Sequence, residues 1–219
     1  MSDGEPEVPR TPPPPSYTDD EGELAVRIAR DTVDSAASGK QSKAFQIPAK
    51  FNEKCGVFVT LNTWPKEELR GCIGYPQPIF PLAKALIKAA EGATEDPRFP
   101  PLRREELDGI VVEVSIMTPP ELVQVKKTKD YPREIAVGVD GLIAAQGPYK
   151  GLLLPQVAVD WNWGVEEFLS QTCMKAGLMP DAWLEESTKI YRFQSEIFGE
   201  ETPRGVVKRR MLGVPHAGP

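Results

Sequence analysis

The residues best suited to chemistry lie in one stretch, Leu69-Arg70-Gly71-Cys72-Ile73-Gly74-Tyr75, where a thiol stands between two glycines and follows an arginine. A nearby cation lowers the pKa of a thiol, and Arg70 is placed to do this at Cys72. Glycines permit a sharp turn or a close backbone approach, so the amides around Gly71 and Gly74 could form an anion-binding nest. The same residues could equally form a buried strand that needs small neighbours for packing.

Three functions therefore fit this stretch. In an enzyme, Cys72 would be the nucleophile, and Glu113 or Asp140 would serve as its base or orienting carboxylate. In a binding module, Arg70 and Arg98 would receive a phosphate or carboxylate without turnover. In a protein-interaction or structural module the motif would serve packing only, and the thiol would be inert. The binding module needs the fewest special features, and its expected binding residues are Arg70, Gly71, Ile73, Gly74, Arg98, Asp140, Pro155 and Gln156.

Composition excludes several other classes of function. The net charge of −6 argues against broad binding to nucleic acid or anionic membranes. No apolar run approaches the roughly 20 residues that span a bilayer, and the N-terminus lacks the features of a signal peptide. Three cysteines without a C-x-x-C pair weigh against a disulfide framework and a zinc site, and the single histidine, His216, excludes a protease-like triad. We therefore expect a cytoplasmic protein without an evident metal or cofactor.

Local signals predict the elements that position the stretch. Thr18 and Glu21 have the spacing of a capping box, which predicts a helix over residues 18–38. The run 55–61 is rich in β-branched residues, and a short polar connection joins it to 69–73. Together they predict an antiparallel hairpin with the thiol on its returning strand.

The later elements follow from periodicity and from turn residues. Glu113 is a charge within the apolar alternation of 110–117, so it either faces solvent or is buried and paired, with Arg70 as one possible partner. Asp140-Gly141 predicts a hairpin turn between two short strands. The full set is a surface loop over 44–52, a helix from Leu82 to about Gly92, a stiff connector from Asp96 to Leu102, strands over 110–117, 135–139, 142–145 and 152–154, a helix from Val165 ended by Gly177, and one last strand over 191–197.

Both ends of the chain are predicted to lie outside the folded body, which spans residues 18–200. Residues 1–17 are rich in proline and acidic side chains and predict a disordered tail. Residues 201–219, which include Lys208-Arg209-Arg210, predict a flexible basic tail. Within the body, Leu69–Tyr75, Asp96–Leu102 and Leu154–Val157 each place Gly or Pro beside polar side chains. We expect these three segments to converge on one concave surface.

Several segments resemble the AMMECR-type domain family, in family order over roughly residues 20 to 200. They are Leu69 to Gly74 (LRGCIG), Asp96 to Leu102, Glu113 to Ser115, Gly138 to Leu142, Gly151 to Ala158, Phe168-Leu169 and Lys175 to Leu178. The resemblance implies an α+β (mixed α/β) fold in which an antiparallel or mixed sheet is flanked by helices, with a smaller second subdomain. It also implies Memo-like and radical-SAM proteins as partners, because some relatives are fused or linked to such domains. The basic end, Val207 to Arg210, resembles archaeal members. Some relatives carry a histidine where this chain has Asp140, so a Cys–His pair is not available here.

Overall fold

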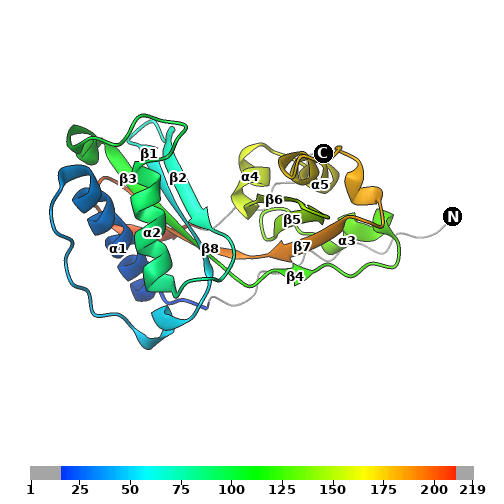
Figure 1. Cartoon of the computed structure of the whole chain (residues 1–219), viewed down its shortest axis with the longest axis horizontal. Helices are drawn as coiled ribbons and strands as arrows, with labels where there is room; N and C mark the ends of the chain where they lie inside the picture. The colour runs from blue at the N-terminus through cyan, green and yellow to red at the C-terminus, as the bar shows by residue number, and fades with distance from the viewer. Residues whose placement is uncertain (1–15, 211–219) are drawn as a thin grey trace. The chain divides into compact units, whose positions relative to one another are not determined.

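The computed structural model describes residues 16–210, and these form two compact units. The motif unit comprises residues 16–119 and 196–210 and contains Cys72, whereas the insert unit comprises residues 120–195. Helices and antiparallel strand pairs occur in both units, so the fold is α+β, as predicted (Figure 1). Of the tails predicted over 1–17 and 201–219, residues 1–15 and 211–219 lie outside the described residues. No helix within 16–210 is long and apolar enough to cross a membrane.

In the motif unit, two helices pack on one face of a five-stranded sheet (Figure 1). The strands lie in the order β2-β1-β3-β8-β9. Their bounds are β1 (Gly56–Thr63), β2 (Leu69–Tyr75), β3 (Ile110–Met117), β8 (Ser195–Glu200) and β9 (Val207–Arg210), and the helices are α1 (Asp19–Ser38) and α2 (Leu82–Thr94). Two 3₁₀ turns, Ala49–Asn52 and Arg104–Gly109, complete the unit.

Local signals at the start of the chain are confirmed. The Thr18 hydroxyl accepts the Glu21 N–H, and the Glu21 carboxylate accepts the Thr18 N–H, so α1 begins with the predicted capping box. Gly39 ends the helix with φ 66°, in the left-handed region that glycine tolerates. The hairpin of β1 and β2 also forms, and it pairs Thr60 with Cys72.

The segment predicted as a surface loop over 44–52 is partly core. Ala49–Asn52 forms a 3₁₀ turn, and the side chain of Phe51 is fully buried. Its ring meets that of Tyr17 edge-on at 6.3 Å, so Tyr17, which the sequence assigned to the N-terminal tail, belongs to the folded body. The prediction was wrong here because the two aromatic partners are far apart in the sequence.

Residues 201–210 are also part of the folded body rather than a basic tail. β9 pairs antiparallel with β8, and Arg209 forms an ion pair with Glu196 and stacks on the Phe198 ring at 4.4 Å. The basic side chains of this segment were interpreted as solvated, but two of them pair with carboxylates on other elements. Arg209 pairs with Asp19 of α1, and Arg210 pairs with Glu113 of β3.

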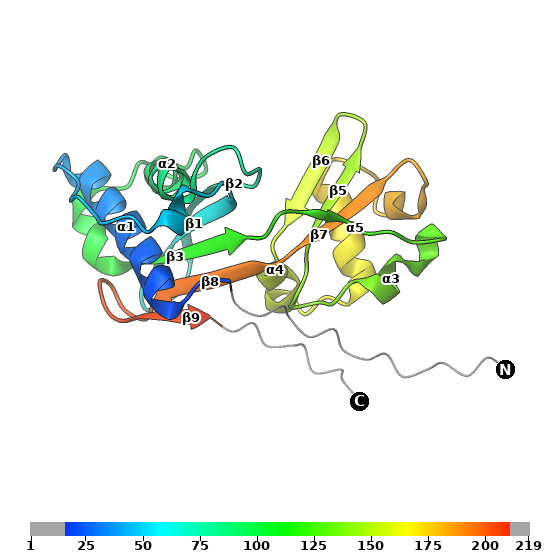
Figure 2. The ribbon, with the colours of Figure 1, turned by 90° about the horizontal axis from the view of Figure 1, so that it is seen from below.

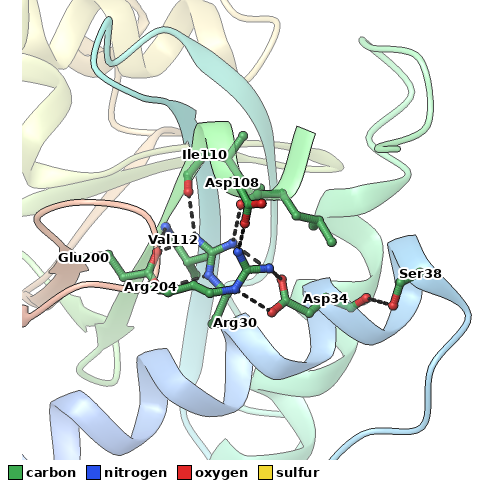
Figure 3. Close-up of polar contacts among 9 residues, drawn as sticks. Arg30, Asp34, Ser38, Asp108, Ile110, Val112, Glu200 and Arg204 are labelled. Atoms are coloured by element: carbon green, nitrogen blue, oxygen red, sulfur yellow. Dashed lines mark hydrogen bonds and ion pairs between the residues drawn. The ribbon is translucent and has the colours of Figure 1, made fainter. Parts of the chain in front are cut away.

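An arginine network holds β8 and the following turn against α1 (Figure 3). The buried Arg30 of α1 pairs with Glu200, whose carboxylate also accepts the Val112 N–H at 3.0 Å. Arg30 donates further to the carbonyl of Ile110 at 2.7 Å. Arg204, in the turn after β8, pairs with Asp34 of α1 and with Asp108.

The insert unit is a four-stranded sheet, ordered β4-β7-β5-β6, with α5 packed on it (Figure 2). Phe168, Leu169 and Cys173 of α5 are fully buried in a core that includes Leu142 and Ala144 of β5. The strands are β4 (Glu121–Leu122), β5 (Gly141–Gln146), β6 (Tyr149–Leu153) and β7 (Lys189–Phe193). The helices are α3 (Tyr131–Glu134), α4 (Pro155–Asp160) and α5 (Val165–Lys175), and the 3₁₀ turns are Thr128–Asp130 and Ala182–Leu184.

Two predictions in this region were wrong. No strand forms over 135–139, because the buried Asp140 carboxylate accepts the Ala136 N–H at 2.9 Å and folds this segment into a turn. The hairpin turn therefore lies at Gly147, between β5 and β6. The single strand predicted over 191–197 is two strands, since β7 and β8 belong to different sheets.

Candidate functional site

Cys72 lies in a row of three side chains across the sheet of the motif unit. The register pairs Thr60 with Cys72 on β2 and with Glu113 on β3. Val59 and Leu61, on either side of Thr60, are fully buried in the core beneath the helices. Side chains alternate along a strand, so the row lies on the sheet face opposite the helices. The Thr60 hydroxyl donates to Cys72 Sγ at 3.3 Å.

The thiol of Cys72 is neutral at physiological pH. Burial raises its pKa, and the hydrogen bond from Thr60 and the charge of Arg98 oppose this rise only in part. The predicted lowering of the pKa by Arg70 is therefore wrong. Cys55 and Cys173 are more deeply buried, and burial raises the pKa of each to about 11.

A carboxylate and an arginine close the outer edge of β2 beside the thiol. Asp96 accepts the Cys72 N–H at 2.8 Å, and its side chain is 1% exposed. Arg98 forms a fork with this carboxylate, at 3.0 Å from Nε and 2.7 Å from Nη2, and donates to the Cys72 carbonyl at 3.3 Å. The hydrogen bonds from Arg98 hold the pKa of Asp96 well below its usual range. The Cys72 N–H is thus already bound to Asp96. The anion nest expected from the amides around Gly71 and Gly74 stays a prediction.

Arg70 is the extra residue of a bulge, and its guanidinium pairs with Glu106 rather than with the thiol. The register passes from Leu61 opposite Gly71 to Asn62 opposite Leu69, which leaves Arg70 without a partner on β1. The side chains of Arg70 and Glu106 approach to 2.8 Å, and that of Arg70 is 12% exposed. The hydrogen bond from Arg70 lowers the pKa of Glu106. Arg70 therefore pairs with Glu106 and not with Glu113, the partner considered from the sequence. Arg70 is therefore a structural cation in this conformation.

The Phe99 ring lies beside both arginines, 5.8 Å from the Arg70 guanidinium and 5.7 Å from that of Arg98. The side chain of Arg98 is nevertheless 56% exposed. Of the two arginines expected to bind an anion, Arg98 is the one that faces solvent.

Close packing accounts for both glycines of the motif. A Cβ on Gly71 would lie 2.3 Å from the Ala93 carbonyl oxygen at the end of α2. A Cβ on Gly74 would lie 2.2 Å from the Phe58 ring, which covers that glycine on the same sheet face as the thiol. Ile73 lies on the helix side, where it packs against the core. The close approach that the packing hypothesis expected is present at both positions.

Glu113 completes the row as a paired carboxylate. Its side chain is 14% exposed and forms an ion pair with Arg210 of β9 at 3.2 Å. The sequence interpretation missed both Arg210 and Thr60. Strand alternation carried a signal for Thr60, which is a polar residue between two core positions, but no local pattern joins Arg210 to Glu113.

Three predicted site residues belong to the insert unit. Asp140 is fully buried, and its carboxylate accepts from Ala136 and, at 2.7 Å, from the Gln194 amide. Pro155 is the first residue of α4, and Gln156 follows it, 8% exposed. Their joining Cys72 in one site stays a prediction. Within residues 16–210, no group of three or more His, Cys, Asp or Glu side chains could hold a metal ion.

Comparisons with known proteins assign the chain to a family. The chain matches AMMECR1 over residues 26–198. Protein MJ0810 of Methanocaldococcus jannaschii is 54% identical over 195 residues, which cover 88% of this chain and 97% of that protein. The crystal structure of the uncharacterised protein PH0010 from Pyrococcus horikoshii matches with a TM-score of 0.84 and 52% identity, and the match covers 90% of this chain and 99% of that one. The chain belongs to the AMMECR1 family.

Proposed function

We propose that the motif unit binds a small anionic ligand at the outer edge of β2, with Arg98 as the principal contact. The observation that carries this proposal is a guanidinium that is held rigidly yet exposed. Its hydrogen bonds to Asp96 and to the Cys72 carbonyl use Nε and Nη2, which leaves Nη1 to donate to a phosphate or carboxylate oxygen. A side chain fixed before binding loses little conformational entropy on binding.

The surroundings of Arg98 favour binding over thiolate chemistry. Asp96 is ionised, so it offsets the charge of Arg98, and recognition rests more on hydrogen-bond geometry than on net charge. The raised pKa of Cys72 leaves a neutral thiol, which is a weak nucleophile. The thiol, the Thr60 hydroxyl and the Phe99 ring then supply polar and apolar contacts near the anion.

A titration of the ¹⁵N-labelled protein with inorganic phosphate, and separately with succinate, tests the proposal. We expect the amide signals of Cys72, Arg98 and Phe99 to move together. Arg98→Lys keeps a cation beside Asp96 but loses the fork, so the affinity should fall at least about tenfold, the worth of one charge-assisted hydrogen bond.

Arg103→Lys is the matched control, because Arg103 is a nearby, 80% exposed arginine that also lies beside a carboxylate. Equal weakening by both substitutions, or signals that move over the whole surface, would show that the anions interact with general surface charge and would refute a site at Arg98.

A further inference from the structure

An apolar groove lies on the helix side of the motif unit, away from the row that contains Cys72. It measures about 480 Å³ and runs between α1, α2 and the segment 43–47. Ile47 and Ile87 are 41% and 42% exposed there, although both are large aliphatic side chains. Large exposed aliphatic side chains gathered on a groove are typical of a surface that binds a partner or another segment. The apolar lining residues are Ile28, Phe45, Ile47, Ala83 and Ile87.

The charges around the groove select an acidic occupant. Lys43, Lys84 and Lys88 line it, against the single acidic residue Glu91. Lys84 and Lys88 also lie 5.3 and 5.5 Å from the Phe80 ring, which keeps their ammonium groups over this part of α2. An occupant with two or three carboxylates beside an aliphatic residue would match both the lysines at the rim of the groove and the apolar residues on its floor.

The chain itself has such a sequence a short distance away. Residues 3–8 read Asp-Gly-Glu-Pro-Glu-Val, with three carboxylates next to a valine. The described chain starts at Ser16, whose N–H and hydroxyl both donate to Glu196, and Tyr17 lies under the Lys50 ammonium at 4.2 Å. Lys50 comes three residues after Ile47, the last residue of the segment 43–47 that forms one wall of the groove.

The chain before Ser16 is long enough to bring residues 3–8 to the groove. From Asp19 to Ile28, α1 rises 1.5 Å per residue, or about 14 Å. At about 3.1 Å per residue, the eight residues from Ser16 back to Val8 are long enough to span about 25 Å. The reach of about 25 Å exceeds the roughly 14 Å along α1 by about 10 Å, which is available for the chain to turn back from the start of α1 toward the groove.

We propose that residues 3–8 of this chain dock in this groove, with their carboxylates at the lysine rim and Val8 on the apolar floor. The docked segment covers Ile47 and Ile87 without taking part in the site at Arg98. High salt releases it, because the contacts at the rim are exposed ion pairs.

The test uses the full chain with labelled methyl groups. Docking predicts nuclear Overhauser contacts between the Val8 methyls and those of Ile47 or Ile87, and their loss in 0.5 M NaCl. Neutralising Lys84 and Lys88 to Gln should also abolish them, whereas Lys150→Gln, an exposed lysine of the insert unit, should leave them unchanged.

Two results would overturn the proposal. Absence of these contacts at low salt, with groove signals identical in the wild type and in Glu5→Gln/Glu7→Gln, would show that residues 3–8 do not occupy the groove. Contacts seen only between differently labelled molecules in a mixed sample would assign the groove to the segment of a second copy. Contacts within one molecule at every protein concentration would support it.

Discussion

At the scale of single residues, the site shows which parts of its chemistry the sequence could predict. The β-branched run over 55–61 and its short polar connection to 69–73 correctly put Cys72 on the returning strand of a hairpin. It could not reveal the bulge that turns Arg70 toward Glu106, because a bulge depends on how two strands pair rather than on either sequence alone. Arg98, assigned only as one of several binding residues, emerges as the exposed cation at the edge of β2.

Alkylation with iodoacetamide should modify Cys72 before Cys55 and Cys173, because Cys72 is half-buried whereas the other two cysteines are buried. The rate should still be below that of free cysteine at pH 7.5 and should rise about tenfold per pH unit toward pH 9, since burial raises the thiol pKa. Thr60→Val removes the donor to the sulfur and should slow the reaction further. Peptide-resolved mass spectrometry measures all three rates, and a plateau near pH 7 would contradict a neutral thiol.

Acid should weaken the fold through Asp96. Its pKa in the folded protein lies below the ordinary value of 3.8, so the folded state favours the carboxylate. Its stabilisation is therefore complete above about pH 5 and is lost as the pH falls through 4 and below. Asp96→Asn should lower the free energy of unfolding by about 1.5–3 kcal/mol at pH 7, as for hydrogen bonds to a charged group.

Urea unfolding of both proteins between pH 3 and pH 7 measures this difference, which should shrink toward low pH. Glu95→Gln changes the neighbouring, exposed carboxylate and serves as the control. A difference that stays constant with pH would mean that Asp96 acts through packing rather than through its charge.

At the scale of elements, the two motif glycines should respond differently to alanine. Both substitutions should cost about 1–3 kcal/mol of unfolding free energy, as overpacking does. At Gly74 the obstacle is the Phe58 side chain, so adding Phe58→Ala should restore part of the loss. At Gly71 the obstacle is the backbone carbonyl of Ala93, which no side-chain truncation removes.

Gly109→Ala is the control for these measurements, because no atom lies within 4 Å of the position of its Cβ. Chemical denaturation of the single and double variants gives the coupling free energy. If Phe58→Ala restored Gly71→Ala as well, the two close approaches would not be independent.

Elements with local signals were predicted well, and those that depend on distant partners were not. The capping box of α1 and the glycine that ends it require only neighbouring residues. Asp140-Gly141 carries an equally strong local signal for a hairpin, but the Asp140 carboxylate binds Ala136 and Gln194 instead. Hydrogen bonds to a buried carboxyl group outweigh a turn preference, and sequence spacing does not show which residues will be buried.

At the scale of the whole molecule, residues 201–210 should matter for stability. A chain ending at Arg210 should melt within a few degrees of the full chain. A chain ending at Glu200 loses β9 and the contacts of Arg209 with Glu196 and Asp19, and its melting temperature should fall by ~10 °C, equivalent to about 3 kcal/mol. Calorimetry measures both melting temperatures. Equal values would show that residues 201–210 do not contribute to the stability of the folded body.

The strand pairs at the ends of the insert unit also bear on how this chain can be redesigned. β4 and β7 pair antiparallel, with Glu121 opposite Arg192, so the chain enters and leaves the insert unit at adjacent positions. In the motif unit, β3 and β8, which precede and follow that insertion, are neighbours in one sheet. A short turn from Pro119 to Ser195 could therefore replace residues 120–194 and leave β3 and β8 complete. Such a minimal chain would carry the whole edge of β2, and the anion titration could be repeated on it with no contribution from Asp140, Pro155 or Gln156.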